Sequence, residues 1–326
     1  MEHLYDIIKI LEEWITHSLS YFINLDKRIN IMYLFSSLLL AFYVYKRSDI
    51  QESFLIYIFN KKVWLGRSAV VDYMFFFLNG LLKILLIGPY VIFGFYIAFY
   101  VNEGLLQLFG FPRSSLSLEK TLFLYTITLT IVNDFFGYLT HYLMHKIPLL
   151  WEFHKIHHSA TTLNPLTQYR IHPIELIINN VRNILIFGLI TGIFDYLSRH
   201  QVDKVMFLGV NVFTFLFFFI GANLRHSHVK LKYPRVIEYI FISPFQHQIH
   251  HSTKTTHFNK NMGSKFAIWD YLFGTLVLSK STSRINFGIP KEDLNYNSFS
   301  ANLFNPFLKI INKLSGYFRF ANRDHQ

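Results

Sequence analysis

The chain has 326 residues and no cysteine; 52% of the residues are hydrophobic, 16% are charged, and the formal net charge is +11. This composition excludes an ordinary soluble protein, and the missing thiols exclude disulfides, thiolate metal sites and a catalytic cysteine. The positive charge does not indicate nucleic-acid binding, because basic residues beside apolar spans more often mark the cytoplasmic face of a membrane protein.

The first 100 residues contain three segments with distinct patterns. The N-terminal run MEHLYDIIKILEEW does not resemble a cleaved signal peptide, and we expect an amphipathic helix at a membrane interface. An apolar run at 29–45 is near the lower length limit for a spanning helix. A longer run at 72–100 predicts either one tilted helix or a hairpin broken near Gly88-Pro89. Lys83 lies inside this run and needs a partner or access to the interface.

The next apolar helix is expected to begin at Ser117, which can cap it, and to end before Pro148. Two more apolar stretches follow, at 174–194 and 205–220. The first is interrupted by polar residues and is expected partly at the interface, whereas the second is the stronger candidate for a span. Beyond residue 280 the chain becomes polar, and 307–320 predicts a basic amphipathic helix.

Three short histidine strings lie between these apolar segments: HYLMH at 141–145, HKIHH at 154–158 and HQIHH at 247–251. Residues three and four apart are neighbours on a helix, and neutral imidazole is a common ligand of iron, zinc and copper. The strings therefore predict a metal site. Its candidate ligands are His141, His145, His154, His157, His158, His247, His250 and His251.

Eight imidazoles exceed the ligands that one ion accepts, so the sequence predicts two ions. Asp134 lies seven residues before His141 and is either a further ligand or an acceptor that fixes a histidine tautomer. His172, His226 and His228 lie near expected helix ends, where each either completes a coordination shell or is a lone interfacial histidine. With redox-active iron such a site suits O2 activation, and with zinc it suits Lewis-acid chemistry.

The segments DFFGYLTHYLMH, LWEFHKIHHS, SPFQHQIHHS and SKFAIWDYLFGT resemble the fatty acid hydroxylase/sterol desaturase superfamily over about 134–275. The resemblance implies a membrane enzyme that uses two Fe ions and O2 to hydroxylate or desaturate a fatty acyl chain, a sterol or a related lipid. It also implies metal roles for the eight histidines and extends them to His172 and His226. The WDYLFGT segment is expected to supply packing and no ligands.

We therefore expect an all-α fold, a polytopic membrane helix bundle with a dinuclear metal site in a cytosolic cap. The expected domains are N-terminal membrane helices at 1–115, a catalytic domain at 116–280 and a polar tail at 281–326. The chain has no flavin, nicotinamide, haem or iron–sulfur motif, so an external redox protein is expected to donate electrons.

Two alternative functions remain open at this point. One is a zinc-dependent membrane hydrolase, against which the absence of an HExxH motif counts. The other is a non-catalytic membrane protein that binds metal or haem. Zinc is also a possible occupant of the site in a purified sample. Metal content with anaerobic reduction, followed by lipid analysis after exposure to O2, distinguishes the three functions.

Overall fold

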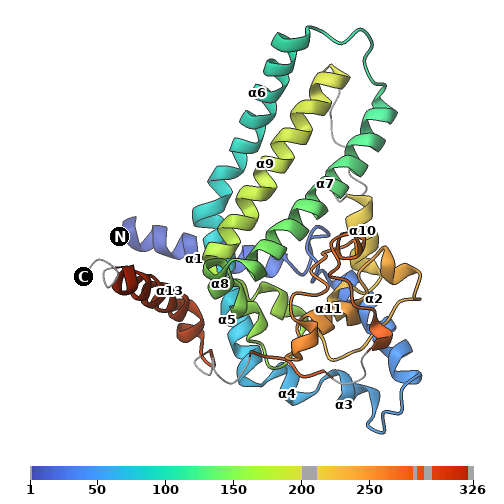
Figure 1. Ribbon diagram of the computed structural model, residues 1–326, viewed down its shortest axis with the longest axis vertical. Helices are drawn as coiled ribbons and strands as arrows, with labels where there is room; N and C mark the ends of the chain where they lie inside the picture. Colours follow the sequence, from blue (N-terminus) through green and yellow to red (C-terminus); the bar gives the residue numbers. More distant parts are fainter. Residues whose placement is uncertain (1, 200–210, 282–284, 290–295, 322–326) are drawn as a thin grey trace.

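The computed structural model describes residues 2–199, 211–281, 285–289 and 296–321 (Figure 1). In this part of the chain the regular elements are helices, and β-pairing is limited to two isolated bridges, Phe241–Phe266 and Ser252–Phe287. The predicted all-α class is therefore confirmed.

Three long apolar segments rise from one end of the molecule (Figure 1). Among the described residues, those long and apolar enough to cross a bilayer are Arg67–Phe109, Leu118–Lys146 and Pro173–Ser198. The first comprises α5 (Arg67–Leu82), a π-helical turn, a 3₁₀ turn and α6 (Ile92–Phe109). The other two are α7 (Leu118–Lys146) and α9 (Pro173–Ser198).

The path from α5 to α6 agrees with the single helix expected for 72–100 and not with the hairpin, because α6 continues away from α5 in Figure 1. The π-helical and 3₁₀ turns interrupt its regular geometry. Pro89 lies in the 3₁₀ turn Gly88–Val91, where its missing amide hydrogen interrupts the regular helix. Lys83 finds the partner that its position requires, since its Nζ donates to the Tyr21 hydroxyl at 2.9 Å.

The ends of α7 and the polar residues of α9 have local explanations. Ser117 accepts a hydrogen bond from the amide of Lys120, as expected for the cap of α7. The 174–194 segment, expected partly at the interface, is a regular helix. Some of its polar groups pair on the helix itself, since the Arg182 guanidinium donates to the side-chain oxygens of Asn179 and Asn183.

The two shorter apolar runs pack against each other below the long helices. The 29–45 run forms α2 (Ile31–Lys46), which is shorter than the candidate spans. The described part of the 205–220 run forms α10 (Val212–Phe219), and residues 205–210 lie outside the described residues. Tyr33 of α2 packs against Phe217 and Phe218 of α10.

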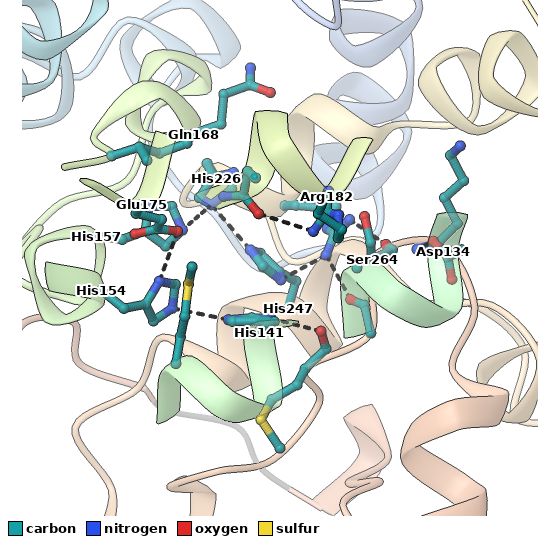
Figure 2. Close-up of a pocket in the computed structure, with 18 of the residues that line it drawn as sticks. Asp134, His141, His154, His157, Gln168, Glu175, Arg182, His226, His247 and Ser264 are labelled. Atoms are coloured by element: carbon teal, nitrogen blue, oxygen red, sulfur yellow. Dashed lines mark hydrogen bonds and ion pairs between the residues drawn. The ribbon is translucent and has the colours of Figure 1, made fainter. Parts of the chain in front are cut away.

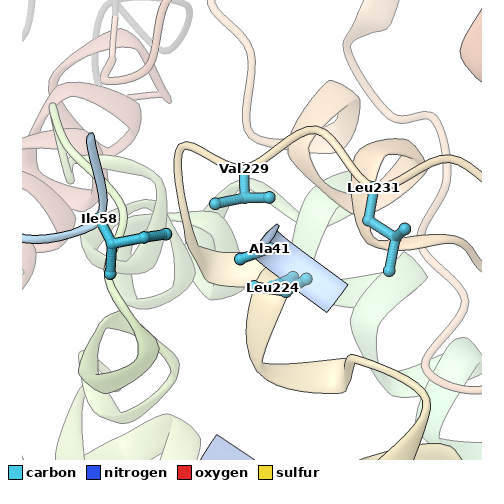
Figure 3. Packing of buried hydrophobic residues seen from close by; sticks show 5 residues of the cluster. All are labelled: Ala41, Ile58, Leu224, Val229 and Leu231. Carbon is cyan, nitrogen blue, oxygen red and sulfur yellow. The ribbon is translucent and has the colours of Figure 1, made fainter. Parts of the chain in front are cut away.

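A helical cap surrounds the lower ends of α7 and α9 (Figure 1). Ala41 of α2 packs with Ile58, Leu224, Val229 and Leu231 in the cluster that Figure 3 shows. This cluster joins α2 to α3 (Phe54–Ile58) and to the 3₁₀ turn η4 (Ala222–His226). The remaining cap helices are α4 (Lys61–Trp64), α8 (Pro148–His158), α11 (Pro244–His250) and α12 (Ile268–Leu272), with 3₁₀ turns at Pro165–Tyr169, Ile237–Tyr239, Thr255–His257 and Ser279–Ser281.

Two amphipathic helices flank the junction of the cap and the long helices (Figure 1). They are α1 (Glu2–Ser20) and α13 (Phe299–Ala321), and both confirm helices predicted from the sequence. Large apolar side chains are exposed on each, among them Ile8 and Leu19 on α1 and Phe304 and Leu308 on α13. α13 is fastened to α8 by an ion pair between Lys313 and Glu152.

Candidate metal centre

Nine histidines converge in the cap as two groups whose candidate ligand atoms lie within 4.8 Å of one another in each group. The first group contains five side chains and the second contains four. Their rings meet where the groups adjoin, since the ring centroids of His158 and His251 are 4.6 Å apart. Group one consists of His141, His145, His154, His158 and His250, and group two of His157, His226, His247 and His251.

Each HxxHH string is divided between the two groups. On a helix, positions i and i+4 are about 40° apart, whereas i+3 lies about 60° to the other side. His154 and His158 accordingly enter group one while His157 enters group two. The third string reverses this arrangement, because His247 and His251 join group two and His250 joins group one.

Local sequence signals fix the two short helices that carry these strings. Pro148 occupies the first turn of α8, where its missing amide is tolerated. Ser243 and Gln246 form a reciprocal capping box at the start of α11. Gln248, inside the third string, donates to the carbonyls of Leu224 and Val229 at 2.8 Å each. These bonds hold η4 against α11 and thereby place His226.

In group one, oxygen acceptors on the protein fix the histidine tautomers. The Nδ1 atom of His141 lies 2.7 Å from the Met262 carbonyl, and that of His250 lies 2.8 Å from the Lys260 carbonyl. The Nδ1 atom of His154 is 3.0 Å from Oε1 of Glu175 (Figure 2). Carbonyls only accept, so Nδ1 carries the proton and Nε2 presents a lone pair to the group.

The inward Nε2 atoms approach one another closely. The Nε2 atoms of His141 and His154 are 3.0 Å apart, and those of His154 and His158 are 3.3 Å apart. The Nε2 atoms of His145 and His250 are buried and have no hydrogen-bond partner. Two ligands at right angles about one metal, each at about 2.1 Å, also lie about 3.0 Å apart. The donor set therefore fits a bound cation.

Group two has the same inward-facing pattern. The Nε2 atom of His226 lies 3.2 Å from that of His157 and 3.1 Å from that of His247, and His251 is 3.2 Å from His247. His247 differs at its outer nitrogen, because Nη2 of Arg225 lies 2.8 Å from its Nδ1. Arginine only donates, so Nδ1 accepts and the ring proton is on Nε2. Metal binding at that atom then releases a proton.

Burial keeps the histidines of the cap neutral. Burial is the largest cause that lowers the pKa of His154, His158 and His250 well below 6.5, and neighbouring imidazoles lower it further. In group two, burial lowers the pKa of His157 to about 3 and that of His226 well below its usual value. A neutral imidazole has a nitrogen lone pair available, which is the form that a metal requires.

Three of the sequence candidates lie outside both groups. Nδ1 of His172 accepts from the amide of Ile174 at 3.1 Å, which makes it the cap of α9, and its Nε2 donates to the Leu303 carbonyl at 3.1 Å. Both of its nitrogens are therefore engaged. His228 donates to the Tyr57 carbonyl at 2.7 Å. Asp134 accepts three hydrogen bonds from the segment that follows the third histidine string.

The WDYLFGT segment positions a loop beside the histidines and supplies no ligand to either group. Asp134 accepts from the amides of Lys265 and Phe266 and from the Trp269 indole, at 2.9, 3.1 and 3.0 Å. Asp270 accepts from the amide of Met262 at 2.9 Å. The Met262 carbonyl then faces His141, so these carboxylates act on the centre through the loop.

The sequence patterns did not predict three residues that support the histidines. Glu175, Gln248 and Arg225 all touch a histidine or its supporting turn, yet none forms a metal-ligand motif. Glu175 could have been noticed as an acidic residue in the first turn of an otherwise apolar helix. Gln248 and Arg225 gave no comparable signal, because their roles depend on contacts with segments distant in the sequence.

Residues 126–275 match a family model described as fatty acid hydroxylase. The chain is 29% identical over 160 residues to the ornithine lipid hydroxylase OlsE of Rhizobium tropici, covering 49% of this chain and 44% of that protein. It is 27% identical over 165 residues to the alkylglycerol monooxygenase of Caenorhabditis elegans, covering 51% and 29%. The Xenopus tropicalis alkylglycerol monooxygenase is 25% identical over 158 residues, covering 48% and 31%.

The chain thus spans less than half the length of these relatives. No solved structure matches the chain.

Proposed function

Since this chain belongs to the fatty acid hydroxylase/sterol desaturase superfamily, we propose that it is a membrane-bound di-iron oxygenase that hydroxylates a lipid. The observation that carries the proposal is the pair of adjoining all-imidazole groups, one with five histidines and one with four. Hydroxylation is preferred over desaturation because the relatives named above are a hydroxylase and monooxygenases.

The ligand assignment under this proposal follows the two groups. Each group would hold one iron ion through inward-facing Nε2 atoms. When bound, the iron pair supplies O2 activation and insertion of one oxygen atom into a C–H bond, which side chains alone cannot perform. The overall reaction consumes a lipid C–H bond, O2, two electrons and two protons, and gives the alcohol and water.

The protein's own residues orient the histidines and leave a cavity beside them. Glu175 and the Met262 and Lys260 carbonyls hold His154, His141 and His250 in the tautomer whose Nε2 atom faces inward. A cavity of about 330 Å³ reaches histidines of both groups and gives the substrate access (Figure 2). The electrons would come from an external redox protein, because the chain carries no redox motif of its own.

We further propose a multi-pass topology with the cap in the cytoplasm. Lys61, Lys62 and Lys146 lie at the cap ends of the candidate spans, which agrees with the positive-inside rule. Within this topology we propose that 116–280 is the catalytic domain, between N-terminal membrane helices at 1–115 and a polar tail at 281–326.

The function is tested by single turnover with ¹⁸O₂. Protein loaded with Fe²⁺ under argon is given membrane lipids and a chemical reductant, and lipid mass spectra are recorded before and after ¹⁸O₂ is admitted. The proposal expects a product that carries one ¹⁸O atom. Hydrolysis that needs zinc and proceeds without O2 would instead identify a zinc hydrolase, and a haem absorption band would identify a haem protein.

A further inference from the structure

The cavity beside the histidines is lined by more basic than acidic side chains. It is bordered by α7, α9, η4 and the loop at 262–265. Four basic side chains line it, but only two acidic ones do, Asp134 and Glu175. Figure 2 shows Arg182 and Asp134 on the side of this cavity away from His154. The basic residues are Arg28, Arg182, Arg225 and Lys265.

The three guanidinium groups retain unused donors. The Nε atoms of Arg28, Arg182 and Arg225 are buried and lack a hydrogen-bond partner among the residues that the structure describes. Arg182 otherwise donates only to amide oxygens on its own helix. Nη2 of Arg225 donates to the Gly263 carbonyl at 3.2 Å and contacts His247. Without a bound metal these partners are all neutral. When a metal binds His247, the ring proton lost from it would partly offset the charge of Arg225, whereas the amide oxygens beside Arg182 stay neutral.

The two carboxylates that line the cavity bind other groups, and within the described residues only Oε2 of Glu175 lacks a hydrogen-bond partner among their oxygens. Asp134 binds two backbone amides and the Trp269 indole, and Glu175 binds His154. Nζ of Lys265 donates to the Thr214 hydroxyl at 2.9 Å. Among the ion pairs found in the described residues, none joins these basic side chains to a carboxylate.

Buried charges without a counter-charge are costly, and arginine donors match the oxygens of carboxylates and phosphates. We infer that the cavity binds the oxyanion of a lipid head group, a carboxylate or a phosphate, and that the head-group end of the substrate enters first. This inference rests on the proposed function. It places the hydroxylated carbon in the head group or in the carbons next to it.

The size of the cavity agrees with this orientation. Its volume of about 330 Å³ lies near the lower end of the roughly 300–1,000 Å³ found for ligand pockets. Such a space accommodates a head group but not two acyl chains. The chains would therefore remain outside the cavity, beside the apolar surfaces of α7 and α9.

Binding to the iron-loaded protein under argon tests the inference without turnover. The probes are dihexanoyl phosphatidic acid for a phosphate, N-dodecanoylglycine for a carboxylate, dihexanoylglycerol as the neutral lipid, and inorganic phosphate alone. Titration calorimetry should show at least one anionic lipid binding about tenfold or more tighter than the neutral lipid. The tighter of the two anionic lipids identifies the oxyanion. Equal or tighter binding of the neutral lipid overturns the inference, as does free phosphate that binds as tightly as phosphatidic acid.

Substitution of Arg182, which lines the cavity, gives a second test of the inference. Arg182→Gln should weaken binding of the preferred anionic lipid by about tenfold or more, leave the neutral lipid unaffected and retain iron. Arg182→Lys should recover part of the affinity. The matched control is Arg235→Gln, which removes the same charge from an exposed position of the cap.

A replacement variant and two further results complete the test. If Arg182→Gln fails to fold, Arg28→Gln replaces it, since Arg28 lines the same cavity. Cavity variants that bind every lipid as the unaltered protein does overturn the inference. Anion-selective binding without an ¹⁸O product refutes the proposed oxygenase but leaves the head-group site in place.

Discussion

At the scale of residues, the metal centre depends on which nitrogen of each ring carries a proton. In His141, His154 and His250 the outer Nδ1 atom faces an oxygen acceptor, so the inner Nε2 atom is free to bind a metal. Glu175 is the one acceptor in this set that also contributes a carboxylate. Its contact with Nδ1 orients the ring of His154 so that Nε2 faces the group.

The Glu175→Gln variant should weaken iron binding about 10- to 100-fold, because the carboxylate behind His154 is lost. Competition with a chromogenic chelator under argon measures this affinity. Glu119→Gln is the matched control, since Glu119 lies in the first turn of α7 and is exposed. Equal iron affinity in Glu175→Gln and the unaltered protein would contradict the role assigned to Glu175.

His172 should contribute to stability and leave the metal in place. Burial lowers its pKa to about 4 in the folded protein, against 6.5 for an exposed histidine. The folded state thus binds fewer protons, so this contribution is present above pH 6.5 and is lost as the pH falls towards 4. His172→Asn keeps a capping oxygen without titrating.

Thermal unfolding at pH 7 and pH 5 tests this statement. The stability advantage of the unaltered protein over His172→Asn should shrink at pH 5, and the iron content of the variant should equal that of the unaltered protein. A gap that is the same at both pH values, or a variant that lacks iron, would refute this assignment.

The histidine strings predicted which side chains lie together but not how they divide between the two groups. The spacing of His154, His157 and His158 predicts a shared helical region, and all three lie on α8. Their division between two groups depends on where α7 and α11 approach, which spacing alone does not encode. His226 could not be separated from His228 for the same reason, because the chain leaves η4 after His226 and the two side chains meet different surroundings.

At the scale of elements, α6 and α9 approach closely through small residues. A Cβ atom added to Gly192 would lie 2.5 Å from the backbone oxygen of Ala98, and one added to Gly188 would lie 2.7 Å from that of Gly94. Small residues allow such backbone contact between membrane helices. Because α9 carries Glu175 and Arg182 at its cap end, this packing also positions the centre.

Gly192→Ala should therefore destabilise the protein by about 1–3 kcal/mol, since the backbone of α6 must move. The control is Gly104→Ala on α6, where an added Cβ meets no atom within 4 Å. That change should be neutral or stabilising, because alanine favours a helix. Thermal unfolding in one detergent compares the two. A Gly192→Ala protein as stable as Gly104→Ala would show that the contact between α6 and α9 is not tight.

Element boundaries were predictable where a local signal existed. Ser117 and Pro148 bracketed α7, and the polar tail contained the helix expected there. The run at 72–100 was harder, because Gly88-Pro89 is compatible with either a kink or a hairpin. Contacts with distant segments, such as that of Lys83 with Tyr21, are not encoded in this local pattern.

At the scale of the whole molecule, the candidate spans separate the cap from the loop between α6 and α7 (Figure 1). The absence of cysteine makes this arrangement testable with single introduced thiols. Arg113→Cys in that loop should react with a membrane-impermeant maleimide on intact cells. Arg235→Cys in the cap should react only after the membrane is opened. The reverse pattern would place the metal centre outside the cytoplasm.

The central claim is that one chain holds two iron ions in two adjoining imidazole groups. The most direct measurement is the iron content of protein reconstituted with Fe²⁺ under argon, combined with iron-edge X-ray absorption. We expect about two iron ions per chain, each surrounded mainly by histidine nitrogens. His157→Ala and His158→Ala, which alter different groups, should each lower this content. One iron ion or fewer per chain in the unaltered protein would contradict the account.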